Sequence, residues 1–190
     1  MRRARRLVVL CDVSRSMRPY AAPALGLLWA ASSAGGEVFT FASELTLVTP
    51  DMGSSGPAGA IRRTAGAVDD PFGGTRIAAS VEAVLRPPHR PVTLAAVGVV
   101  ISDGWDGDSP AQLARAIEKL RRSVHRLVWL NPRAGWAGYR PDVAALQAAL
   151  PHCDAHLPAG TVNELVHSVA LLTAEEMPAS PCTAMTRAAL

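Results

Sequence analysis

Three oxygen-bearing side chains follow directly on the first apolar stretch of the chain. Residues 7–10 contain two β-branched valines and no alternating polar residues, which predicts a strand buried on both faces. Asp12, Ser14 and Ser16 come immediately after it. A carboxylate with two hydroxyls suits a hard divalent cation such as Mg²⁺ or Mn²⁺. The same residues would also suit a turn that only caps the next helix, and this stretch alone leaves both interpretations open.

A second aspartate stands in the same relation to a second apolar run. Residues 94–102 predict another buried strand, which leads directly into Asp103. A third hydroxyl, that of Thr75, follows Gly73 and Gly74, where the backbone can approach closely. Parallel strands end at one edge of their sheet, and open α/β sheets bind ligands there. We therefore expect both aspartate loops and Thr75 to converge on one site.

Predicted strands and helices alternate along the chain, which indicates an α/β fold with a doubly wound, mostly parallel six-stranded sheet and helices on both faces. Residues 37–42 and 44–49 are two β-rich runs joined through Ser43, so we expect one antiparallel edge strand. The other strands are predicted at 126–130 and 152–157. Helices are predicted at 19–33, 75–85, 110–122, 142–150 and 161–172, with a weak helical patch at 58–67.

The size and hydropathy of the chain predict one globular domain. It has 190 residues, of which 49% are hydrophobic, and its mean hydropathy is +0.17. We expect residues 1–173 to form this domain. Residues 174–190, interrupted by Pro178 and Pro181, are expected to be a flexible tail.

The composition also argues against several functional classes. The net charge of +3 owes much to the opening MRRARR, and only 5% of residues are aromatic, so nucleic-acid binding has little support. Three cysteines without a C-x-x-C pair argue against a disulfide scaffold or a zinc site and fit a cytoplasmic protein. The first apolar run stops at Asp12, and the run 21–34 is too short for a bilayer, so neither a signal peptide nor a membrane span is expected.

Two other groups of polar residues could bind metal. The first alternates along the predicted strand 152–157: His152, Asp154 and His156. These residues fit an edge strand better than a metal site, because no fourth ligand is evident. The second group is Asp106 and Asp108 after Asp103, which resembles part of a calcium loop but lacks its spacing and closing glutamate. Trp105 and Trp129 are expected to pack in the core, with Trp105 alternatively on a partner surface.

An enzymatic alternative uses the same first loop. Asp12 could accept a phosphoryl group, as in haloacid dehalogenase-like phosphatases, but Ser14 stands where those enzymes need a second aspartate. No nucleophile elbow, Walker A loop or dinucleotide fingerprint follows a strand. We therefore assign no catalytic residue and expect a metal-dependent binding module that is not an enzyme. The alternative is a Mg²⁺-dependent phosphohydrolase-like enzyme with the same site.

The three motifs together, Asp-x-Ser-x-Ser, Gly-Gly-Thr and Asp-Gly, resemble the von Willebrand factor A (VWA) family with its metal-ion-dependent adhesion site. The resemblance extends over residues 7–172 in the order of motifs, strands and helices. It implies that Mg²⁺ or Mn²⁺ is bound by the hydroxyls of Ser14, Ser16 and Thr75. It also implies that Asp12 and Asp103 contact the ion directly or through water, and that an acidic residue of a partner completes the shell.

Finer features are similar to the CoxE-like branch of this family, the bacterial accessory proteins of carbon monoxide dehydrogenase. They are CDVSRSM, GGTR, ISDGWD and RLVWLNP. This resemblance implies a MoxR-type AAA+ ATPase as partner and a client metalloenzyme whose maturation the protein assists. The sequence departs from the branch at residues 69–74, which read DDPFGG where a loop containing tryptophan is expected.

Overall fold

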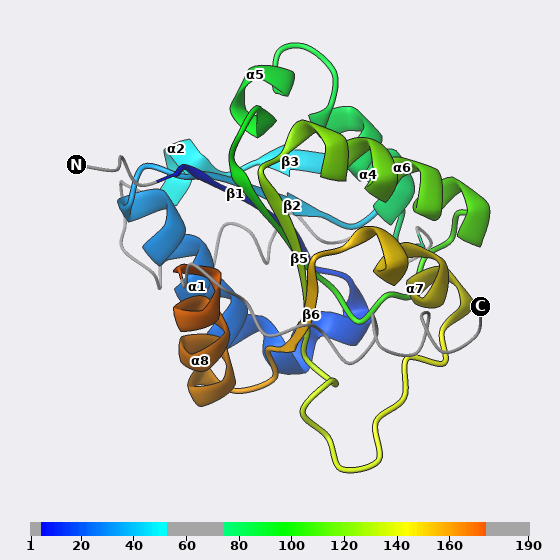
Figure 1. The fold of residues 1–190 in the computed structure, drawn as a ribbon. Coiled ribbons are helices and arrows are strands. Elements are labelled where there is room, and N and C mark those ends of the chain that lie inside the picture. The colour runs from blue at the N-terminus through cyan, green and yellow to red at the C-terminus, as the bar shows by residue number, and fades with distance from the viewer. Residues whose placement is uncertain (1–4, 53–73, 174–190) are drawn as a thin grey trace.

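A single six-stranded sheet forms the centre of the computed structural model, which describes residues 5–52 and 74–173 (Figure 1). Its strand order is β3-β2-β1-β4-β5-β6. The strands are β1 (Leu7–Asp12), β2 (Glu37–Phe41), β3 (Leu45–Leu47), β4 (Val97–Ile101), β5 (Arg126–Asn131) and β6 (Ala155–Pro158). All neighbours pair in parallel except β2 and β3, so the predicted fold class and its antiparallel edge strand are confirmed.

Helices cover both faces of this sheet, with α1 and α8 on one face and α4, α6 and α7 on the other (Figure 1). The longer helices are α1 (Ala21–Ser33), α4 (Ile77–Val84), α6 (Pro110–Ser123), α7 (Ala144–Ala149) and α8 (Val162–Thr173). The shorter ones are η1 (Arg15–Tyr20), α2 (Thr49–Met52), α5 (Arg90–Thr93) and η2 (Leu150–His152). Within the described ranges, no helix combines the length and apolar character needed to cross a bilayer.

The first strand is buried on both faces, as its sequence predicts. Val8 and Leu10 belong to the core under α4, α6 and α7, whereas Val9 and Cys11 belong to the core under α1 and α8. Each of these four residues is at most 1% exposed. Since β2 and β4 flank β1, the carboxyl end of β1 lies in the middle of the sheet edge.

Several predicted boundaries differ from the structure. The helix expected from Thr75 begins at Ile77, because Thr75 and Arg76 are held by neighbouring loops, as described below. The helix expected at 142–150 is shorter and continues as η2, and the strand expected at 152–157 begins at Ala155. The predicted patch at 58–67 and the predicted tail at 174–190 lie outside the described residues, so the proposed domain boundary stays a prediction.

The loop after β4 passes close to α7 through a glycine with left-handed backbone. Gly104 has φ +88°, and a Cβ atom built on it would lie 2.7 Å from Cβ of Leu146. A side chain at this position would therefore strain the backbone and overlap α7. Gly104 directly follows Asp103, so this close approach also fixes the path of the chain at the candidate site.

We predict that Gly104→Ala lowers the free energy of unfolding by about 2 kcal/mol or more, from left-handed strain and overpacking. Gly26→Ala is the matched control, because Gly26 lies within α1 and an added Cβ meets nothing within 4 Å. Alanine is favoured over glycine inside a helix, so the control should keep or slightly raise stability. Urea denaturation measures both, and equal midpoints for the two variants would contradict the prediction.

A candidate metal site at the carboxyl edge of the sheet

Asp12 is the last residue of β1 and is only 2% exposed. Its Oδ1 accepts a hydrogen bond from the amide of Ser14 at 2.8 Å, and its Oδ2 accepts one from the hydroxyl of Ser102 at 2.7 Å. Burial raises the pKa of Asp12 to about 6, against the lowering effect of these hydrogen bonds, and the charge of Asp103 raises it further. The carboxylate is thus held in one orientation by two different loops.

The hydroxyls of Ser14 and Ser16 lie next to each other, with 3.3 Å between the two Oγ atoms. Ser14 occupies the N-cap position of η1, yet its side chain makes no capping hydrogen bond. The helix-capping interpretation of this motif is therefore not realised at Ser14. Instead, the turn begun by Asp12 brings both hydroxyls together at the end of β1.

Asp103 follows β4, the strand beside β1, and is 3% exposed. The hydroxyl of Ser102 links the two aspartate loops, because it donates to Asp12 and accepts the amide hydrogen of Gly104 at 3.0 Å. Oδ1 of Asp103 accepts a long hydrogen bond of 3.4 Å from the amide of Trp105. Two buried carboxylates therefore lie at the ends of adjacent strands, and the backbone of the loop after β4 is tied to Asp12 through Ser102.

Thr75 is brought to this edge by its backbone. Its carbonyl accepts a hydrogen bond of 2.7 Å from the amide of Gly107, in the loop after β4. The amide of the next residue, Arg76, donates a hydrogen bond of 2.8 Å to the carbonyl of Ala42, which directly follows β2. The segment thus spans from one neighbour of β1 to the other. Among the described residues, the hydroxyl of Thr75 forms no hydrogen bond with the other four predicted ligands, so only its backbone is joined to the site.

Arg133, which was not predicted from the sequence, also reaches this site. Its Nη2 atom lies 3.1 Å from Oδ2 of Asp103. Its amide donates to Oδ1 of Asn131, the last residue of β5, and Nδ2 of Asn131 donates to the hydroxyl of Tyr139. The sequence did contain a sign that the loop after β5 belongs to the site, because Asn131 is a polar residue at the end of a buried strand, as Asp12 is.

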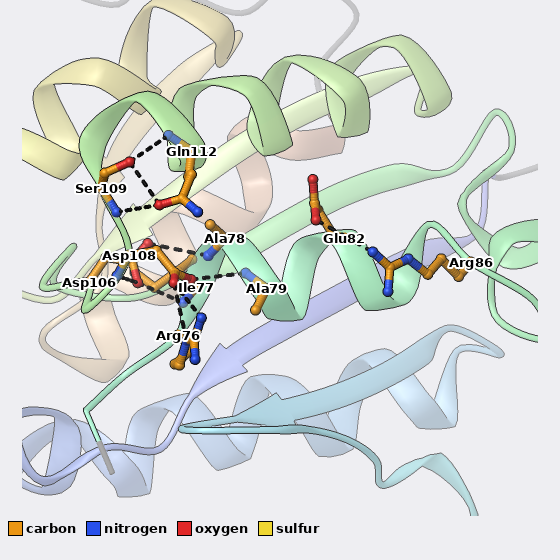
Figure 2. A network of polar contacts seen from close by, with 10 residues as sticks. All are labelled: Arg76, Ile77, Ala78, Ala79, Glu82, Arg86, Asp106, Asp108, Ser109 and Gln112. Carbon is orange, nitrogen blue, oxygen red and sulfur yellow. Dashed lines mark hydrogen bonds and ion pairs between the residues drawn. The ribbon is translucent and has the colours of Figure 1, made fainter.

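Asp106 and Asp108 bind the backbone at the start of α4 (Figure 2). Their carboxylates accept hydrogen bonds of 3.0 to 3.2 Å from three successive backbone amides, those of Ile77, Ala78 and Ala79. Asp108 also pairs with Arg76 at 2.7 Å. The loop after β4 is thereby fastened to the start of α4, which holds Thr75 in place between them.

The three polar residues predicted near β6 do not gather into a site. Asp154 accepts a hydrogen bond from the amide of Leu127 and pairs with Arg121 at 2.8 Å. His152 lies in η2, whereas the ring of His156 packs against Tyr139 with 6.0 Å between centroids. Across the described part of the chain, no group of three or more His, Cys, Asp or Glu residues could hold a metal. Of the three residues, only His156 lies in the edge strand β6, so the edge-strand interpretation is wrong for His152 and Asp154.

The donors at the end of β1 fit Mg²⁺ or Mn²⁺. They are oxygens only, and two of them are buried carboxylates. Oδ2 of Asp103 is buried and has no hydrogen-bond partner. Buried carboxylates need a positive charge nearby, and a hard divalent cation with oxygen ligands meets that need.

The strand order and the motifs at the sheet edge define a domain of the von Willebrand factor A type. The chain belongs to the family described as VWA domain containing CoxE-like protein, whose pattern matches residues 1–165. Domains of this type are generally protein-interaction modules and not enzymes. The expected family and its interaction role are thereby confirmed.

Two of the solved structures that match the chain share its fold at low sequence identity. The aerotolerance-related membrane protein from Bacteroides fragilis has a TM-score of 0.53 and 14% identity, covering 86% of this chain and 94% of that one. BatB from Bacteroides thetaiotaomicron has a TM-score of 0.50 and 13% identity, covering 87% and 97%. The von Willebrand factor type A protein from Catenulispora acidiphila has a TM-score of 0.48 and 16% identity, and the match covers 78% of this chain but 42% of that one. No curated protein matches the sequence.

We predict that Asp106→Ala lowers the free energy of unfolding by about 1–2 kcal/mol, because the first amides of α4 lose their acceptor. Glu82→Gln is a control on the same helix, where Glu82 forms exposed ion pairs with Arg86 and Lys119. Such surface pairs contribute at most about 1 kcal/mol. Chemical denaturation compares the two variants, and an equal loss in both would contradict the capping role of Asp106.

A pH-dependent prediction comes from His156, whose pKa is lowered by burial to about 4, from an ordinary value of 6.5. Between these values the unfolded chain binds a proton that the folded chain does not, so acidification should destabilise the fold. From pH 7 to pH 5 this histidine should cost about 2 kcal/mol. His156→Gln should remove that contribution, whereas the exposed control His125→Gln should keep it.

The measurement is chemical denaturation in EDTA at several pH values, read as the difference between wild type and His156→Gln. The difference is needed because the raised pKa of Asp12 acts in the opposite direction, stabilising the fold as the pH falls. A difference that stays constant between pH 7 and pH 5 would show that His156 does not titrate as expected.

Proposed function

We propose that this chain is a metal-ion-dependent protein-binding module with a metal-ion-dependent adhesion site for Mg²⁺ or Mn²⁺. The observation that carries the proposal is the pair of buried carboxylates, Asp12 and Asp103, at the ends of the adjacent strands β1 and β4, together with the adjacent hydroxyls of Ser14 and Ser16. Thr75 would add a third hydroxyl from the segment that spans the sheet edge.

Each of these residues would have a distinct task at the site. Ser14 and Ser16 would offer neutral oxygens, and Asp103 would supply negative charge from the strand beside β1. Asp12 would supply charge too, and its hydrogen bond to the amide of Ser14 fixes the loop that carries both serines. When bound, the ion would supply positive charge that attracts an acidic side chain of the partner, which would take a coordination position otherwise filled by water.

The partner we propose is a MoxR-type AAA+ ATPase, acting with this chain in the maturation of a metalloenzyme such as carbon monoxide dehydrogenase. Membership of the CoxE-like family supports this choice. The surface beside the site also suits a protein, because Trp105 and Trp136 are 58% and 56% exposed. Exposed tryptophans are frequent anchors of protein interfaces.

The phosphohydrolase alternative has less support. Its nucleophile would be Asp12, whose two carboxylate oxygens already accept hydrogen bonds in a buried position. A general base is also wanting, because all five histidines lie outside the three loops of the site. Binding a partner protein requires neither a free nucleophile nor a general base.

We predict that the Ser14→Ala/Ser16→Ala double variant binds Mn²⁺ at least about tenfold more weakly than wild type, since it loses two oxygen donors without burying an unpaired group. Asp12→Ala should abolish the binding. Ser33→Ala and Asp51→Asn are matched controls at exposed positions on α1 and α2. Titration calorimetry measures the affinities, and circular dichroism checks that each variant is folded. Equal binding by wild type and the double variant would refute the metal site.

The same variants separate binding from catalysis. Co-precipitation of the cognate ATPase should require Mg²⁺ and be lost in EDTA and in the double variant. Phosphate esters should not be hydrolysed. Metal-dependent hydrolysis that disappears in Asp12→Asn would favour the phosphohydrolase instead.

A further inference from the structure

Arg133 is a cation within reach of one predicted metal ligand. Its Nη2 atom lies 3.1 Å from Oδ2 of Asp103, whose side chain has no exposed surface, whereas the side chain of Arg133 is 33% exposed. Among the described residues, Arg133 is the only cation paired with either Asp12 or Asp103. The positive charge of this guanidinium therefore lies against one of the two buried carboxylates, that of Asp103.

The pair between Arg133 and Asp103 is close but poorly aligned. Although the two atoms are within ion-pair distance, Oδ2 of Asp103 has no hydrogen-bond partner, and Nε of Arg133 is buried without one. A buried ion pair offsets its desolvation cost only when its geometry is good and its remaining hydrogen bonds are made. This pair is therefore weak enough for another cation to replace it.

The guanidinium of Arg133 also lies near an exposed aromatic ring beside the site. Cζ of Arg133 lies 5.8 Å from the ring centroid of Trp136, and that ring is exposed to solvent. The backbone of Arg133 stays fixed by the hydrogen bond of its amide to Asn131. A small rotation of the side chain could thus exchange Asp103 for solvent while contact with the aromatic ring is kept.

We propose that Arg133 is a tethered counter-ion that competes with the metal for Asp103. It neutralises Asp103 while the metal is absent and leaves the carboxylate when a divalent cation binds. The released guanidinium then lies beside Trp136, where it adds a second positive group for the acidic partner. This inference rests on the proposed function, because it assumes a cation at Asp103.

If Arg133 competes with the metal for Asp103, replacing Arg133 should change the affinity for the metal even without a partner. Replacing Arg133 by methionine removes the competitor and a nearby positive charge, so Arg133→Met should bind Mn²⁺ roughly tenfold more tightly than wild type, or better. Its metal-free form should melt at a lower temperature, because Asp103 loses its counter-ion, and Mn²⁺ should raise that temperature more than in wild type. Arg115→Met, on the exposed side of α6, has the same net charge and should bind within about twofold of wild type.

Titration calorimetry of the three proteins tests this prediction, and the wild type provides a readout that does not depend on any variant being folded. In NMR spectra, the side-chain Nε–Hε signal of Arg133, assigned through its own side-chain correlations, should shift as Mg²⁺ saturates the protein. Equal or weaker Mn²⁺ binding by a folded Arg133→Met, or an unmoved signal at saturation, would overturn the counter-ion role and leave the metal site standing. A wild type that binds neither ion would overturn both proposals.

Discussion

The carboxylate of Asp12 lies at the end of a strand that has no exposed face, and its two oxygens are bound by different loops. One hydrogen bond, from Ser14, shapes the turn that follows β1, and the other, from Ser102, ties that turn to the end of β4. A buried carboxylate without such partners would cost several kcal/mol. The parallel pairing of β1 with β4 is what places Ser102 where it can donate this hydrogen bond.

Other parts of the structure serve to hold the loops around this carboxylate. Asp106 and Asp108 fasten the loop after β4 to the first turn of α4, and that attachment sets the position of the Thr75 backbone. Gly104 lets the same loop pass against α7. The loop after β5 contributes the charge of Arg133 from the third strand end. The site is therefore an assembly of loops, each anchored by contacts outside it.

The sequence was informative where one local pattern has one meaning. Apolar runs without alternation identify β1 and β4 as central strands, and the positions of Asp12 and Asp103 follow because strands in parallel end at the same edge. Asp106 and Asp108 could not be interpreted in this way, since their partners are amides of a helix about thirty residues away in the sequence. The start of α4 was predicted too early for the same reason, because hydrogen bonds to two distant loops keep Thr75 and Arg76 out of the helix. Arg133 could not be assigned to the site from the sequence, because the direction of its side chain after β5 is not visible there.

The balance of charge links the site to the kind of partner it suits. Two buried carboxylates carry two negative charges, and Arg133, which pairs with Asp103, offers one positive charge. Burial and, to a smaller extent, the charge of Asp103 raise the pKa of Asp12. A divalent cation would balance both carboxylates by itself, and the guanidinium of Arg133 would then be in excess at the rim, next to the exposed ring of Trp136. A metal-loaded site of this composition would be positive on the side that faces solvent. Such a surface would attract a carboxylate and repel a cation, so the proposed metal ion together with Arg133 favours an acidic partner.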